Sequence, residues 1–240
     1  MGTDIHSIAQ VKRDGQWVTV AVSIAGDQRY YNTFAMLANV RNGCGFAGCW
    51  TSTGFPVIHE PRSLPSDLLL ASPEDHTVHV DKTRLVAAWN WDGKDTPIDS
   101  TDASRVSSIT DEDSTMWLGD HSHSWCTLAE LRAFIENVAK KTETFIVGIV
   151  TREEYEEHQR TGKSYESWCS MVSGHGICVV SLVGNDRDPL LDHCTHVQTN
   201  WPVNAFKESG IGDIEKALTL VAERTGAQPE DLRFVYGFDS

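Results

Sequence analysis

Residues 4–22 contain the pattern that most constrains the fold of this chain. Apolar and polar side chains alternate there, and one face of the first strand is formed by Ile5, Ser7, Ala9 and Val11. Alternation with a period of two is typical of a β-strand. Asp14-Gly15 then provides a turn signal that is common in two-residue hairpins, and a second apolar run extends from Trp17 to Val22. We therefore expect the chain to begin with a β-hairpin.

Downstream of the hairpin, helical and extended patterns follow one another without regular alternation. Helices are predicted at residues 33–40, 127–140, 151–162 and 213–224, and strands at 145–150, 177–183, 196–201 and 232–238. Thr127 and Glu130 have the spacing of a capping box, and Gly226 provides a helix stop. Because a doubly wound parallel sheet would alternate strand and helix throughout, we predict an α+β fold. It is expected to be a single domain over residues 1–240, with a largely antiparallel sheet packed by several helices.

Composition limits the partners of this protein. Of the 240 residues, 40% are hydrophobic and 22% are charged, which is ordinary for a soluble globular protein. Acidic residues outnumber basic ones by 34 to 20, giving a net charge of −14 that repels phosphate backbones and anionic lipids. No apolar run approaches the roughly 18 residues of a membrane-spanning helix, and the N-terminus has no signal-peptide pattern. Duplex nucleic acid and membrane are therefore poor default partners, and the six scattered cysteines are expected to remain reduced in a cytosol.

The segment from residue 92 to residue 113 is the most acidic part of the chain. It is poor in apolar groups, and its acidic residues far outnumber its two basic residues, Lys94 and Arg105. A charge run of this kind is usually solvated. We predict an exposed loop or insertion there.

Two short polar clusters contain the residues best suited to catalysis. Asp4 and His6 lie on the same side of the first predicted strand, and a second cluster contains Asp120, His121 and His123. Imidazole nitrogens and carboxylates that converge from separate segments are typical ligands of Zn, Mn or Fe. The metal hypothesis assigns His6, His121 and His123 as ligands. The alternative is that the second cluster is a polar turn before the capping box, with its imidazoles bonded to the backbone.

A glycine-rich loop after the first predicted helix is a candidate anion-binding element. Arg41, Asn42 and Gly43 begin this loop, and Arg62 lies in a second candidate segment. Arginine presents a planar fork that suits phosphate or carboxylate, and backbone amides in glycine-rich loops can approach an anion. The alternative is that these arginines are structural partners of acidic residues.

Several segments resemble a family of uncharacterised proteins encoded by tailed bacteriophages and prophages. They are the opening Met1-Gly-Thr-Asp-Ile-His6, residues 40–48 with the pattern Arg-Asn-Gly-Cys-Gly-Phe-Ala-Gly, residues 119–125 with Gly-Asp-His-Ser-His-Ser-Trp, and the terminal residues 231–239. A further segment, Pro61-Arg-Ser-Leu-Pro65, has Ser63 where the similar element has glycine. The resemblance covers both ends and the middle of the chain. It implies a phage context and expression in the cytoplasm of the infected bacterium, but no activity.

These observations lead to a hypothesis about function. The protein is expected to bind a phosphorylated, nucleotide-like small molecule and to hydrolyse it, as a metal-dependent, phosphodiesterase-like enzyme, with a possible role in counter-defence. The metal ion would activate water, Arg41 would hold the phosphate, and Asp4 or Asp120 would be the general base. The alternative is a non-catalytic binding protein that sequesters a host nucleotide signal or inhibits a host protein, with homo-oligomers building the pocket.

Overall fold

A computed structural model describes residues 4–25, 31–40, 42, 50–51, 54–89, 114–163, 196–207 and 209–239. The predicted acidic loop at 92–113 and the predicted strand at 177–183 lie outside these residues. Among the helices that are described, none is long and apolar enough to cross a membrane.

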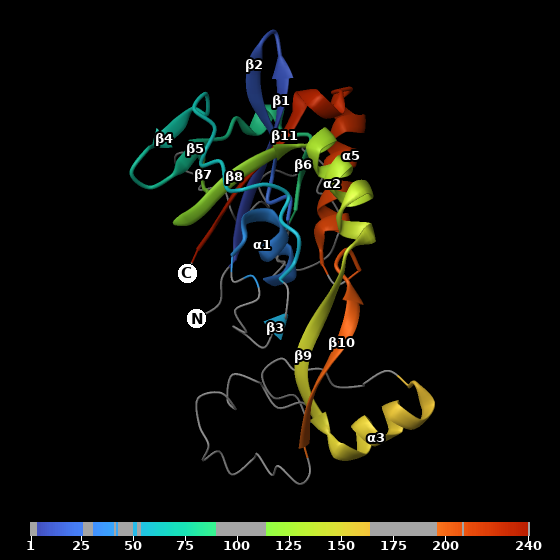
Figure 1. The fold of residues 1–240 in the computed structure, drawn as a ribbon. Helices are drawn as coiled ribbons and strands as arrows, with labels where there is room; N and C mark the ends of the chain where they lie inside the picture. Colours follow the sequence, from blue (N-terminus) through green and yellow to red (C-terminus); the bar gives the residue numbers. More distant parts are fainter. Residues whose placement is uncertain are drawn as a thin grey trace.

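A five-stranded sheet forms the centre of the fold (Figure 1). Its strands lie in the order β6 (Ala87–Ala88), β2 (Gln16–Val22), β1 (Ile5–Arg13), β11 (Leu232–Phe238) and β8 (His121–Thr127). All neighbours are antiparallel except β2 and β6. The predicted hairpin is confirmed: β1 and β2 are joined at Asp14 and Gly15, whose φ angles of 51° and 80° are those that a tight hairpin turn requires.

Helices α1 (Tyr31–Ala38), α2 (Leu128–Asn137) and α5 (Ile211–Thr225) cover one face of this sheet. Their apolar side chains form a core with every second residue of the central strands, such as Ala9 and Phe234. The capping box at Thr127 and Glu130 opens α2, and Gly226 ends α5 in the left-handed conformation. The predicted α+β fold, with a mostly antiparallel sheet packed by helices, is confirmed.

A second sheet covers the opposite face of the five-stranded sheet. It consists of β4 (Leu70–Ser72), β5 (Thr77–His79) and β7 (Thr115–Trp117), in that order. Ile8, Val22 and Val235 of the large sheet pack against Val78, Met116 and Leu118 in a separate apolar core. The central strands are therefore buried on both faces, which the alternating pattern of β1 did not predict.

The third sheet extends away from this body (Figure 1). Strand β9 (Glu143–Thr151) lies between β3 (Trp50–Thr51) and β10 (His196–Asn204), and α3 (Arg152–Thr161) follows β9 at the far end. Single 3₁₀ turns, η2 (Lys82–Arg84), η4 (Ala139–Lys141) and η5 (Pro229–Asp231), complete the described elements.

Candidate functional site

Asp239, just beyond β11, contacts both of the polar clusters singled out in the sequence. The His6 imidazole Nε2 lies 3.2 Å from Asp239 Oδ2, and the backbone N–H of Asp4 donates to Asp239 Oδ1 at 2.6 Å. His121 Nε2 lies 3.1 Å from the backbone carbonyl oxygen of Asp239. Because β11 lies between β1 and β8, the two clusters do not pair directly. Asp239 joins them, and we call Asp239, Asp4, His6, His76, His121 and His123 the Asp239 cluster.

The strand pairing places His6 and His123 on one face, beside Gly237, whereas His121 lies opposite Phe238 and stacks on its ring, which belongs to the helix-covered core. His6 lies opposite Gly237 in the register of β1 and β11, and the pairing of β11 with β8 is irregular between Tyr236 and Phe238. Ser122, inside this irregularity, has a φ of 53°, a conformation that is uncommon for a serine. A local irregularity of this kind re-aims the side chains beside it, here His121 and His123.

The absence of a side chain at Gly237 makes room for the His123 ring. A Cβ built at Gly237 would lie 2.1 Å from the Leu118 carbonyl oxygen and 2.4 Å from His123 Cδ2. Real Cβ atoms do not approach other heavy atoms so closely, so this position requires glycine. His123 Nε2 lies 3.0 Å from the carbonyl oxygen of Gly119.

Rings from the second sheet pack on the cluster. The rings of Trp117 and His6 have centroids 4.6 Å apart, and those of His76 and His123 are 4.3 Å apart. These contacts place His6 and His123 on the face that the second sheet covers. The His6 side chain is 19% exposed and that of Asp239 is 23% exposed, so the pair is partly buried and still reached by water.

Burial lowers the pKa of His123 below its usual value. A hydrogen bond to the Gly119 carbonyl opposes this shift, and the neighbouring His76 and His121 add to it, because a second positive charge beside them is unfavourable. His123 is therefore neutral near pH 7.

The hydrogen bonds of these rings bear on the predicted metal site. A carbonyl oxygen only accepts, so the Nε2 atoms of His121 and His123 are the donors in their bonds to Asp239 and Gly119. Neither atom then has a lone pair for a metal. Within the described ranges there is no group of three or more His, Cys, Asp or Glu residues that is arranged to hold an ion. An ion would therefore be held through the Nδ1 atoms, because a histidine that binds a metal through one nitrogen commonly donates its other N–H to a carbonyl oxygen.

Asp120 is held by its backbone rather than by its carboxylate. Its N–H donates to the carbonyl oxygen of Phe238 at 2.7 Å, and the residue is exposed. The preceding Gly119 has a φ of 84°, and a Cβ there would lie 2.5 Å from the same carbonyl oxygen. The backbone of this turn is thereby fixed against β11.

The predicted anion-binding residues are not all described. Arg41 and Gly43 lie outside the described residues. The Asn42 amide brackets Phe55, accepting from its N–H at 2.6 Å and donating to its carbonyl at 2.8 Å. Arg62 donates twice to Glu130, at 3.0 and 2.8 Å, and lies over the Trp125 ring. Asn42 and Arg62 thus have partners within the fold.

Cys126 is buried, and burial raises the pKa of its thiol well above the usual value. Because the thiolate is the nucleophile, a thiol in this setting is a poor one.

Sequence analysis missed three members or neighbours of the cluster: Asp239, His76 and Trp117. Asp239 is a single carboxylate just beyond the predicted strand at 232–238, with no motif of its own. His76 and Trp117 lie in a turn and a three-residue strand, which have no periodicity to mark them.

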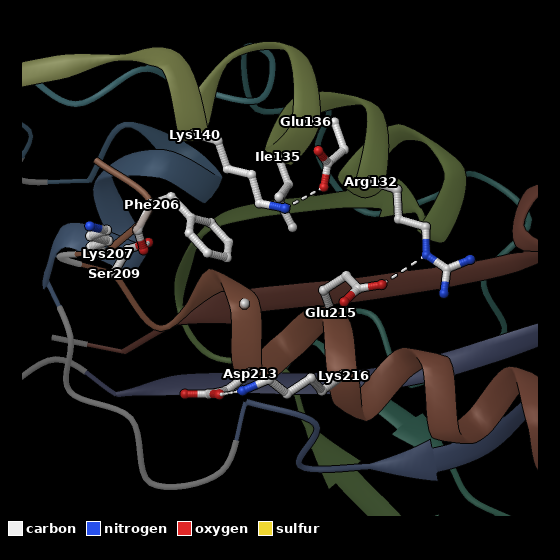
Figure 2. Close-up of a pocket in the computed structure, with 11 residues that line it drawn as sticks. Arg132, Ile135, Glu136, Lys140, Phe206, Lys207, Ser209, Asp213, Glu215 and Lys216 are labelled. Carbon is white, nitrogen blue, oxygen red and sulfur yellow. Dashed lines mark hydrogen bonds and ion pairs between the residues drawn. The ribbon is translucent and has the colours of Figure 1, made fainter. Parts of the chain in front are cut away.

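A cavity of about 440 Å³ lies between α2 and α5, on the other side of the sheet (Figure 2). We call it the α2–α5 cavity. Its lining consists of Arg132, Ile135, Glu136, Lys140, Phe206, Lys207, Ser209, Gly212, Asp213, Glu215 and Lys216. None of these was singled out in the sequence.

Comparison with known proteins gave no relative: no family model, curated protein or solved structure matches the chain.

Proposed function

We propose that this protein binds a phosphorylated, nucleotide-like small molecule at the Asp239 cluster and hydrolyses it by acid–base chemistry. One observation carries the proposal: His6 and His121, from strands that do not pair with each other, both contact Asp239. An imidazole oriented by a carboxylate is a recurring arrangement for moving protons in hydrolysis.

The His6–Asp239 pair supplies the base. An ionised carboxylate only accepts hydrogen bonds, so His6 Nε2 carries the proton that points to Asp239 Oδ2. Nδ1 is then the basic nitrogen of the ring. It would take a proton from water while the water oxygen forms a bond to phosphorus, and Asp239 would stabilise the resulting imidazolium.

His121 helps to hold Asp239 in place. Its Nε2–H donates to the Asp239 carbonyl oxygen, and its Nδ1 lies 2.9 Å from the Ser122 hydroxyl oxygen. The leaving oxygen would take its proton from water as the bond between phosphorus and that oxygen breaks. Neutral His123 would accept hydrogen bonds from the substrate at its remaining nitrogen.

The biological setting belongs to the same proposal. The resemblance to phage and prophage proteins supports a phage-encoded accessory role in the cytoplasm of an infected bacterium. Removal of a nucleotide signal used in host defence is one role that suits such chemistry.

The test is turnover of phosphoester probes by the full chain. Bis(4-nitrophenyl) phosphate and 4-nitrophenyl phosphate report diester and monoester hydrolysis, and a nucleotide mixture can be followed by phosphorus NMR. We expect turnover in the native protein and a rate at least 100-fold lower in His6→Gln. The matched control is His79→Gln, which replaces an exposed histidine of β5 and should leave the rate unchanged. Binding of a nucleotide without turnover would instead support the non-catalytic alternative. If the chain neither binds nor hydrolyses these probes, both the catalytic proposal and the non-catalytic alternative are overturned.

A further inference from the structure

We propose that the α2–α5 cavity is a second binding site, for a small organic anion with a flat ring. The proposal does not depend on the Asp239 cluster, because α2 and α5 cover the opposite face of the five-stranded sheet. A volume of about 440 Å³ is in the range of small-molecule pockets.

The lining is rich in cations for so acidic a chain. It holds Arg132, Lys140, Lys207 and Lys216 against three acidic residues, whereas acidic residues exceed basic ones by 34 to 20 in the whole chain. A local excess of positive charge in a concave site attracts anions. Because the rest of the chain is negatively charged, an anion is attracted to this cavity rather than to the surrounding surface.

Each acidic residue of the lining is neutralised by a cation of the same lining. Arg132 Nε donates to Glu215 at 2.8 Å, Lys216 pairs with Asp213 at 2.8 Å, and Lys140 pairs with Glu136 (Figure 2). Lys207 remains: in the described part of the chain it has no acidic partner within ion-pair distance. Among the described lining residues, the uncompensated charge is therefore positive.

Arg132 is positioned to offer one further donor. Its Nε donates to Glu215 and its Nη2 donates to Thr219 at 2.8 Å, which fixes the guanidinium between the two helices. The contacts described for this side chain do not use Nη1. A guanidinium held by two of its nitrogens loses little further freedom when the third binds a ligand.

The first turn of α5 opens onto the same cavity. Its N-cap is Gly210, which has no side chain to bond the helix amides, and Gly212 is part of the lining. The first amides of a helix favour an anion, and here the Asp213 N–H already donates to the Gly210 carbonyl at 3.1 Å, so the N–H groups of Ile211 and Gly212 are the candidate donors. The cavity thus adds a concave wall and cations to this helix terminus.

An aromatic wall indicates the shape of the ligand. Phe206 Cζ would lie 2.9 Å from a Cβ built at Gly212, so the ring packs directly on the first turn of α5. Lys140 Nζ lies 5.3 Å from the centroid of this ring, and the buried Ile135 lines the cavity beside it. A flat ring can lie against Ile135 and Phe206 while its anionic group reaches Lys207 and the α5 terminus.

The experiment is calorimetric titration of the full chain at low ionic strength. The probes are adenosine 5′-monophosphate and benzoate as ring-bearing anions, adenosine as the ring alone, and inorganic phosphate as the anion alone. We expect the ring-bearing anions to bind at least fivefold more tightly than adenosine or inorganic phosphate. Tighter binding of adenosine 5′-monophosphate than of benzoate would indicate a phosphate ligand, and the reverse a carboxylate ligand. Lys207→Gln and Lys140→Gln should each weaken binding at least fivefold.

Three control variants keep the outcome decisive. Lys141→Gln removes a neighbouring exposed lysine that does not line the cavity, and it should leave affinity within twofold. Gly212→Leu fills the cavity beside Phe206 and should abolish binding, with thermal unfolding showing that the variant still folds. His6→Gln must retain binding. Loss of binding in His6→Gln alone, or equal affinity in all lysine variants, would overturn the site.

Discussion

The imidazole of His6 lies 3.2 Å from the carboxylate of Asp239, although 233 positions separate the two residues. The register of β1 and β11, with Ile5 opposite Phe238, brings them together. The same carboxylate accepts the Asp4 N–H, and the Asp239 N–H donates to the Asp4 carbonyl at 3.2 Å. Asp239 therefore orients a candidate base and also extends the hydrogen bonding of β1 and β11 by one residue pair at the end of these strands.

Replacing Asp239 by Asn separates these two roles. The amide can still accept the Asp4 N–H, but it carries no charge to stabilise a protonated His6. We expect turnover of the phosphoester probe to fall about 100-fold, with a loss of no more than about 1 kcal/mol in the free energy of unfolding. Steady-state kinetics and urea denaturation measure the two effects. Unchanged turnover would remove Asp239 from the proposed mechanism.

Gly237 should tolerate no larger residue. Gly237→Ala places a methyl group against the Leu118 carbonyl and the His123 ring, neither of which is a flexible chain end. We expect a loss of about 3 kcal/mol or more in the free energy of unfolding. Gly15→Ala is the comparison, because nothing lies within 4 Å of its Cβ and only its positive φ opposes the change, at about 1 kcal/mol. Equal losses in the two variants would show that the close approach at Gly237 does not exist in solution.

Acid should weaken the fold through His123. Its pKa in the folded protein is lowered by burial, so below about pH 6.5 the unfolded chain binds more protons at this position than the folded one. The free energy of unfolding should therefore fall as the pH drops below that value. In His123→Gln this part of the pH dependence should disappear, whereas His79→Gln should retain it. Denaturation at several pH values between 5 and 8 makes the comparison.

Arg62 should matter for stability rather than for ligand affinity. Arg62→Lys keeps the charge but cannot donate two parallel hydrogen bonds to Glu130, which also accepts the Thr127 N–H at the start of α2. We expect a loss of about 1 kcal/mol in the free energy of unfolding and unchanged affinity for adenosine 5′-monophosphate. Weaker ligand binding with full stability would instead restore the anion-binding role that the sequence suggested.

Chelation tests the predicted divalent ion. The Nε2 atoms of His121 and His123 donate to carbonyls, so an ion would have to bind the Nδ1 atoms of these rings. We expect turnover to survive prolonged treatment with a chelator, and elemental analysis to find less than about a tenth of an ion per chain, well below the one per chain of a structural site. Activity that is lost on chelation and restored by Zn, Mn or Fe would favour the metal hypothesis.

The elements predicted from sequence are those whose signals are local. Asp14-Gly15 marked the first hairpin, the Thr127–Glu130 capping box marked α2, and Gly226 marked the end of α5, because each signal reflects the backbone chemistry of a few adjacent residues. Boundaries shifted by one to three residues: α1 spans Tyr31–Ala38 rather than 33–40, and α2 ends at Asn137 rather than 140. The second sheet was missed because its strands are three residues long, too short for an alternating pattern to appear.

The candidate site was predicted in part for a similar reason. His-x-His and Asp-x-His are short patterns that can be seen in one segment, and His6 and His121 do share a partner. That partner, Asp239, is a single carboxylate whose neighbours come from strand register rather than from nearby sequence. The α2–α5 cavity is likewise formed by the spacing of two helices distant in the chain.

The central position of β11 has a consequence for how the protein is made. Residues 5–22 are synthesised long before residues 232–238, and the inner edge of β1 has no partner until the latter are made. At about 5 to 20 residues per second, that interval is about 10 to 45 s. During it, the nascent hairpin presents open hydrogen-bonding groups and an apolar face to other chains. The large sheet is completed only after β11 has been made, so expression yield should depend on the chaperones that bind this hairpin.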